Sequence, residues 1–153
     1  MLIVKYKKIK EVFDIRHSTT HTLREPDYKE NDLRCTELCT IDGYTYVHVP
    51  DTVTLPDQSD KILVESVTLT DELRAEIKAF CPHVQLSYAR LQERIRNKYS
   101  ADDETYFTRI SVGALSGTYT MQDDEPALIA GYQAWVEESR EIARLERVTL
   151  GLG

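Results

Sequence analysis

The stretch Val67-Thr68-Leu69-Thr70-Asp71-Glu72-Leu73 divides this 153-residue chain into two parts of different character. Before it, short runs rich in β-branched residues alternate with turn-forming residues, which is typical of strands. After it, apolar residues recur every three or four positions, which is typical of amphipathic helices. Thr70 can cap a helix with its hydroxyl, and the two acids that follow it favour the positive end of the helix dipole. We therefore expect an α+β protein with a β-rich domain at residues 1–69 and a helical domain at residues 70–153.

The dipeptide Asp42-Gly43 is the clearest local signal in the first part. Asp-Gly tolerates positive φ at both positions, as a two-residue hairpin turn requires, so it predicts an antiparallel hairpin with arms at Cys35–Ile41 and Tyr44–Val49. Residues 17–33 have no period and many turn formers, which predicts an ordered loop, at most with a short turn of helix. Further strands are predicted at Leu2–Tyr6, Glu11–Ile15 and Lys61–Leu69.

Helix boundaries punctuate the second part. Pro82 breaks or restarts a helix, Ser100 is a potential N-cap followed by acids, and Asp123-Asp124-Glu125-Pro126 begins the last helix. We expect a bundle of three to four helices. The final stretch, residues 148–153, alternates apolar and small residues; it either frays or docks on a neighbouring subunit. The apolar faces comprise Leu73, Ile77 and Phe80; Val84, Tyr88, Leu91, Ile95 and Tyr99; Tyr106, Phe107 and Ile110; and Leu128, Tyr132, Trp135 and Ile142.

Composition sets limits on the function. The net charge of -7 and the pI of about 5.1 disfavour nucleic-acid binding, because an acidic chain repels phosphate backbones. No apolar run approaches the roughly 18 residues of a membrane-spanning helix, and the first residues do not form a signal peptide. Three cysteines, an odd number, suit a cytosol better than a disulfide framework. We therefore expect no nucleic acid, no membrane, and assembly in a cytoplasm.

Basic residues gather at one end of this acidic chain. The first ten residues contain Lys5, Lys7, Lys8 and Lys10 and no acid. Lysines on an edge strand discourage strand-to-strand aggregation, and this is the first interpretation. The alternative is a contact with an acidic partner.

Three pairs of residues could be metal ligands: His17 and His21, Cys35 and Cys39, and Cys81 and His83. A spacing of four brings two ligands to one metal only on a helix. The segments around the first two pairs lack helical character, and on a strand residues four apart lie about 13 Å apart, too far for two Zn–S bonds of about 2.3 Å. We therefore expect the cysteines to be small apolar fillers on a sheet face, and we predict no metal and no cofactor.

No catalytic signature is present. The predicted hairpin places Cys39 opposite Tyr46 and Glu37 opposite His48, which favours a cross-strand polar pair over an acid–base pair. There is no nucleophile motif and no glycine-rich phosphate loop. The acids at 102–104 and 123–125 begin helices, where capping and the helix dipole explain them. The polar helix face with Arg90, Arg94, Arg96 and Lys98 is expected to be solvated and salt-bridged rather than to bind an acidic partner. We predict no catalytic residue.

A family resemblance covers residues 67–152. It is carried by Asp71-Glu-Leu-Arg-Ala-Glu-Ile-Lys, Cys81-Pro-His-Val, Arg94-Ile-Arg-Asn-Lys-Tyr-Ser-Ala-Asp-Asp-Glu, Tyr132-Gln-Ala-Trp-Val-Glu-Glu-Ser-Arg and Leu150-Gly-Leu. With these runs the chain resembles small proteins encoded in the tail modules of tailed phages and prophages, near the tail-tip genes of siphophages. The resemblance implies a role in the virion or its assembly and transfers no catalytic residue.

Three hypotheses follow. The first is a non-enzymatic phage tail protein, a minor structural component or assembly factor at the distal tail. Its partners would be other tail proteins, and it would be a homo-oligomer or be present in symmetric copies. The second is a small phage-encoded binding module that inhibits or redirects a host protein. The third is a metal-dependent enzyme that uses His17, His21, Cys35 and Cys39.

Overall fold

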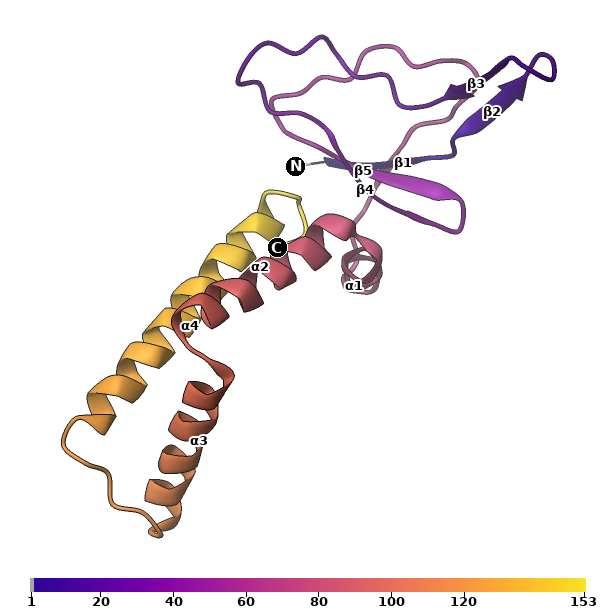
Figure 1. Cartoon of the computed structure of the whole chain (residues 1–153). Coiled ribbons are helices and arrows are strands. Elements are labelled where there is room, and N and C mark those ends of the chain that lie inside the picture. Colours follow the sequence, from indigo (N-terminus) through magenta and orange to yellow (C-terminus); the bar gives the residue numbers. More distant parts are fainter. Residues whose placement is uncertain (1) are drawn as a thin grey trace. The chain divides into compact units, whose positions relative to one another are not determined.

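Strands precede helices along the chain, as predicted (Figure 1). The computed structural model describes residues 2–153. The strands are β1 (Leu2–Tyr6), β2 (Ile9–Val12), β3 (Ser18–His21), β4 (Thr36–Ile41), β5 (Tyr44–Val49) and β6 (Glu65–Val67). The helices are α1 (Asp71–Phe80), α2 (Pro82–Lys98), α3 (Ala101–Ser116) and α4 (Glu125–Val148). The α+β class is confirmed, with antiparallel strands followed by four helices in the described chain.

The larger sheet has four strands in the order β4-β5-β1-β6, and each neighbouring pair is antiparallel. Its β4–β5 hairpin turns at Asp42 and Gly43, whose φ angles are 50° and 79°. Positive φ at both central residues matches the right-handed twist of the flanking strands, so the predicted hairpin is confirmed.

Strand β2 contradicts part of the prediction for the first residues. It ends at Val12 instead of Ile15, and it pairs with β3 in a separate two-stranded sheet. The predicted loop at 17–33 is therefore wrong at residues 18–21, because pairing with β2 stabilises a polar segment that has no strand pattern of its own. Strand β6 spans three residues, much less than the predicted Lys61–Leu69.

Both faces of the four-stranded sheet are buried. This explains why five consecutive residues of the six in β5 are buried, whereas a strand with one exposed face would alternate between buried and exposed residues. One face packs in a cluster of Ile3, Leu38, Cys39, Tyr46, Ile77, Cys81, Val84 and Leu152. The other face packs in a cluster of Val4, Tyr6, Val47, Val49 and Ile62, against residues from the surrounding loops.

Local capping signals decide where α1 and α3 begin. The Thr70 hydroxyl accepts a hydrogen bond from the Leu73 N–H at 3.2 Å. Ser100 and Asp103 form a reciprocal capping box, in which each side chain accepts from the other residue's backbone N–H. Both predicted helix starts are confirmed.

The chain divides into two compact units, and they differ from the predicted domains at 1–69 and 70–153. The first unit, the sheet unit, comprises residues 1–85 and 147–153, and the second, the helical unit, comprises residues 86–146. The predicted boundary at Leu69–Thr70 marks the change from strands to helices. It is not the edge of the sheet unit, because the core of that unit includes Ile77 of α1, Cys81 between the two helices and Val84 of α2.

The last residues fold onto the sheet unit itself. Gly151 has a φ of 74°, and its N–H donates to the Val148 carbonyl at 2.9 Å while the Leu152 N–H donates to that of Arg147 at 3.0 Å. These two bonds define a Schellman motif, which needs a left-handed residue and so favours glycine. Leu152 is consequently buried in the core, so the expectation that this stretch frays or docks on a neighbouring subunit is wrong.

Candidate functional site

The turn that joins β2 to β3 is fixed by one carboxylate. Asp14 Oδ1 accepts the backbone N–H groups of Arg16 at 2.7 Å and His17 at 2.9 Å. The Phe13 N–H donates to the His17 carbonyl at 2.9 Å, which closes the turn. The hydrogen bonds that Asp14 accepts from Arg16, above all, and from His17 lower the pKa of Asp14 because they stabilise its charged form. The turn therefore has a defined conformation.

Both histidines of this region pair with carboxylates of the same hairpin. His17 Nδ1 lies 2.7 Å from Asp14 Oδ2, and His21 Nε2 lies 2.9 Å from Glu11 Oε2. The bond to His21 lowers the pKa of Glu11. His17 and His21, the two candidate metal ligands, thus have separate carboxylate partners. Each of these two pairs links residues within the β2–β3 hairpin.

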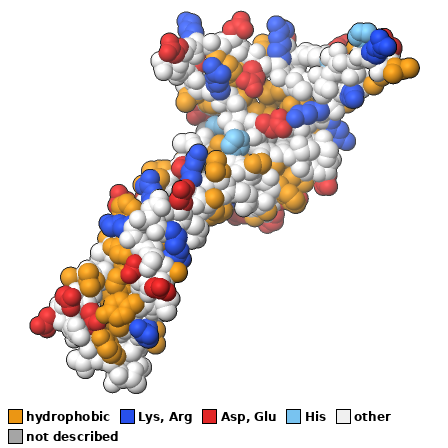
Figure 2. All heavy atoms as spheres, viewed as in Figure 1, with side chains coloured by type: hydrophobic (Ala, Val, Ile, Leu, Met, Phe, Trp, Pro, Cys, Tyr) orange, Lys and Arg blue, Asp and Glu red, His pale blue; other side chains and the backbone are white. Residues whose placement is uncertain are grey.

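Apolar side chains project from this ordered turn. Val12 and Phe13 are each 64% exposed, and Ile15 is fully exposed. We call these three residues the hairpin tip. Figure 2 shows apolar side chains at this end of the hairpin, beside basic ones. Apolar residues held outside the core on a hydrogen-bonded turn have the character of a contact surface, because they leave water only when another surface covers them.

The three cysteines are divided between the two core clusters of the sheet unit. Cys39 and Cys81 belong to one core cluster, whereas Cys35 packs against the cluster on the other face of the sheet. Burial raises the pKa of Cys39 to about 11 and also raises that of Cys35, so both stay protonated at neutral pH. Across residues 2–153, no three His, Cys, Asp or Glu side chains are close enough together to hold a metal ion.

The predicted pairing of Glu37 with His48 is wrong. A register shift between Glu37 and Cys39 places Thr36 opposite His48 and Glu37 opposite Val47, while Cys39 faces Tyr46 as predicted. One extra residue on β4 moves every earlier side chain of the strand by one position. Glu37 instead accepts from the Lys8 ammonium, which lies 2.9 Å from each carboxylate oxygen and whose pKa this bond raises.

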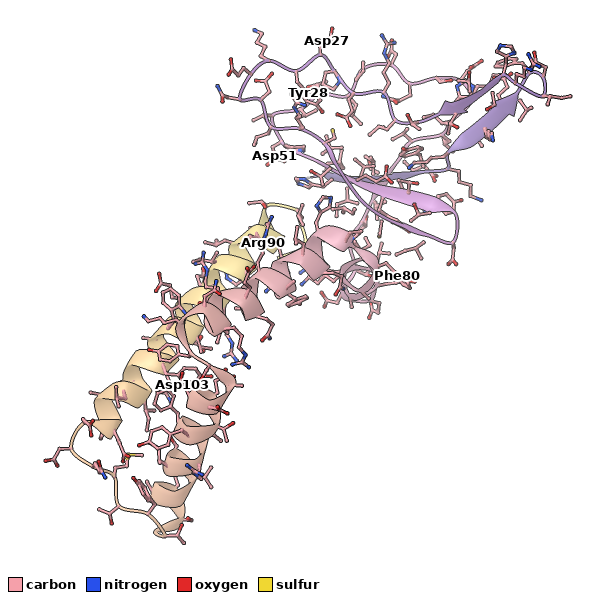
Figure 3. All side chains as sticks on the ribbon, viewed as in Figure 1. Asp27, Tyr28, Asp51, Phe80, Arg90 and Asp103 are labelled. Atoms are coloured by element: carbon pink, nitrogen blue, oxygen red, sulfur yellow. The ribbon has the colours of Figure 1, made fainter. Side chains whose placement is uncertain are left out.

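His48 lies beneath the C-terminal turn of the sheet unit. It is 4% exposed, and its Nε2 has no hydrogen-bond partner among residues 2–153. A Cβ at Gly151 would come within 3.0 Å of its Cδ2, so the glycine allows the close approach. Burial lowers the pKa of His48, because the charged imidazolium is poorly solvated there, although Asp51 (labelled in Figure 3) opposes the shift.

This burial predicts a loss of stability in mild acid. Since the folded state holds the His48 pKa below the ordinary 6.5, the unfolded chain binds the proton first as the pH falls. As the pH is lowered from 6.5, the free energy of unfolding should therefore decrease, by at most about 1.4 kcal/mol per pH unit. Urea unfolding of the wild type and His48→Gln between pH 7.5 and 5.5 measures this: the variant should lack the decline. Equal slopes in the two proteins would contradict the prediction, since the three other histidines are common to both.

Acidic residues at the starts of α3 and α4 accept hydrogen bonds from tyrosine hydroxyls. Glu104 accepts from the Tyr132 hydroxyl at 2.6 Å. Glu125 accepts from the Tyr119 hydroxyl at 2.8 Å and from that of Tyr106, whose pKa this bond raises to about 12. The sequence pattern explained these acids by capping and the helix dipole, and it gave no sign of their tyrosine partners, which lie 28, 6 and 19 positions away.

The lysines near the start of the chain do not all lie on an edge strand, as the first interpretation expected. Lys5 lies on β1, which is flanked by β5 and β6, so it does not protect an edge. The ammonium groups of Lys5 and Lys7 lie 4.8 and 4.6 Å from the centroid of the Tyr44 ring. On α2, Arg96 pairs with Glu104, and Lys98 lies 4.2 Å from the Trp135 ring centroid.

Comparison of the chain with protein-family models, curated proteins and solved structures found no match. The helices of residues 2–153 include none that combines the length and apolar character needed to cross a membrane. The hairpin tip, an apolar surface on an ordered turn, is the feature from which a function can be argued.

Proposed function

We propose that this protein is a non-enzymatic bacteriophage tail component, a minor structural protein or assembly factor at the distal tail, and that it docks on another tail protein through the hairpin tip. The observation that carries the docking role is the exposure of Val12, Phe13 and Ile15 on a turn fixed by Asp14. The resemblance of residues 67–152 to tail-module proteins supports the tail assignment. Symmetric copies on a ring or a homo-oligomer would match the symmetry of tails.

The hairpin tip suits docking on energetic grounds. Full burial of a Phe or Ile side chain stabilises a complex by roughly 1.5–3 kcal/mol. Because Asp14 already orders the turn, little conformational entropy is lost on binding. Lys10 and Arg16 flank the tip, so a partner pocket with an apolar floor and an acidic rim would be complementary to it.

A double substitution, Phe13→Ser with Ile15→Ser, tests the proposal in assembled particles. Mass spectrometry of purified virions should find the wild-type chain, and the variant chain should be depleted at least about tenfold, since one decade corresponds to about 1.4 kcal/mol. Leu115→Ser is the matched control, because Leu115 is 90% exposed on α3 and lies outside the hairpin tip. Circular dichroism of the purified variants checks that they fold.

Two results would contradict the tail assignment and the docking role separately. If the wild-type chain is absent from virions and tails assemble normally without its gene, the protein is not a tail component or an assembly factor. If the double variant enters virions as the wild type does, the hairpin tip is not the docking element. A single host protein retained in stoichiometric amount by the wild type, but not by the double variant, would instead support the host-directed binding module.

A further inference from the structure

A polar pocket lies on the helical unit between α2 and α4. Its volume is about 520 Å³. Residues that line it include Arg90, Arg94 and Asn97 from α2 and Trp135, Ser139 and Glu146 from α4. Figure 3 labels Arg90, whose Nη1 lies 3.7 Å from a carboxylate oxygen of Glu146. A pocket of this size can enclose a small ligand or a side chain of another protein.

Arg94 carries a charge without a counter-ion. Its side chain is partly buried, and its guanidinium makes no hydrogen bond or ion pair with any residue from 2 to 153. Its backbone carbonyl, by contrast, accepts from the Trp135 indole N–H at 3.2 Å. A partly buried cation loses hydration without gaining an opposite charge, so an anion in the pocket would be stabilised.

A second polar group of the pocket is also unpaired. Ser139 is 1% exposed, and its Oγ has no hydrogen-bond partner within the described chain. The neighbouring buried serine, Ser87, differs from it, because its hydroxyl donates to the Ala143 carbonyl at 3.3 Å. A buried hydroxyl left unpaired is destabilising, and an acceptor oxygen of a ligand would satisfy it.

We propose that this pocket binds a carboxylate group carried on a short aliphatic chain, with the Arg94 guanidinium paired to the carboxylate and the Ser139 hydroxyl donating to it. The planar guanidinium matches a carboxylate with two parallel hydrogen bonds. Glu93 and Glu146 line the same pocket and repel a dianion such as hydrogen phosphate more strongly than a monoanion, so a monoanion is favoured of the two. Leu91, Ile142 and Ala143 supply apolar wall for the aliphatic chain. An acidic side chain of a partner protein and a free carboxylic acid share this chemistry.

Titration of the full chain with defined probes tests the site. The probes are pentanoate, its neutral isostere pentanamide, inorganic phosphate, and the capped peptide acetyl-Ala-Glu-Ala-amide. NMR follows two sets of resonances. The side-chain N–H resonances of Arg94 report binding at the guanidinium, and the backbone amide resonance of Ser139 reports binding at the serine. Pentanoate should bind at least about tenfold more tightly than pentanamide and phosphate. Tighter binding of the peptide than of pentanoate would assign the source to a protein partner, and the reverse order to a free acid.

Three variants locate the binding. Arg94→Met keeps the side-chain length and should weaken pentanoate binding at least about tenfold, and Ser139→Ala should weaken it several-fold. Arg144→Met is the control, because Arg144 lies on α4 outside the pocket and pairs with Glu141 at 2.7 Å, so binding should be unchanged. Arg94→Lys, which keeps the charge and loses the two-pronged geometry, should give an intermediate affinity and serves if Arg94→Met fails to fold.

Several outcomes would overturn the proposal. They are equal binding of pentanoate by the wild type and Arg94→Met, equal binding of pentanoate and pentanamide, tighter binding of phosphate, or no resonance shift at the highest pentanoate concentration. None of these measurements involves the hairpin tip, so the carboxylate site and the proposed docking role stand or fall independently.

Discussion

Leu152→Ala is expected to lower the free energy of unfolding by about 3 kcal/mol, within the range of roughly 2–5 for truncation of a buried leucine. Leu152 is 0% exposed and packs in one cluster with Ile3, Ile77 and Val84. These partners come from β1, α1 and α2, so the cavity left by alanine opens among several elements and cannot close by movement of one of them. Urea unfolding of the purified chain, followed by circular dichroism, measures the effect.

Leu115→Ala provides the control for this substitution. It removes the same atoms from a side chain that is 90% exposed, so the free energy of unfolding should change by less than about 0.5 kcal/mol. A loss of under about 1 kcal/mol for Leu152→Ala would mean that the C-terminal turn does not complete the core of the sheet unit.

Phe107→Ala is expected to lower the free energy of unfolding by about 3–5 kcal/mol, as is typical of a buried phenylalanine. Phe107 is 7% exposed, and its ring centroid lies 6.0 Å from that of Tyr99 and 5.4 Å from that of Tyr132. Edge-to-face contacts such as the one with Tyr99 add stabilisation beyond the buried area, because the ring edge is positive and the face negative. The variant should also lose near-ultraviolet dichroism from the tyrosines around it.

Phe80→Ala is the matched control for Phe107→Ala. Phe80 ends α1 and is 61% exposed, so its truncation should have little effect on stability (Figure 3). Similar losses for the two variants would show that the aromatic cluster around Phe107 does not stabilise the helical unit.

The features that could be predicted from the sequence are those encoded within a few residues. Asp42-Gly43 fixes its hairpin because the turn needs positive φ at two positions. Thr70 and Ser100 begin helices because their hydroxyls satisfy N–H groups only three residues away. Each of these signals is local, so no knowledge of the rest of the fold was needed.

The features that sequence reasoning missed depend on distant contacts. Strand β3 has a polar sequence and exists through its pairing with β2. The register shift near Leu38 has no signature in the sequence, yet it changes the partner of His48. The pocket at Arg94 was missed because its unpaired groups lie on two helices, and only the fold shows that Ser139 and Arg94 share one pocket.

The discontinuous course of the sheet unit constrains how the chain can fold during its synthesis. Residues 2–85 leave the ribosome with most of both core clusters present, but the position that Leu152 fills stays open while the 61 residues of the helical unit are translated. The nascent sheet unit therefore lacks one fully buried member of that cluster throughout the interval. Because transiently exposed apolar surface favours aggregation, we expect the nascent sheet unit to be more prone to it before residue 152 emerges than afterwards.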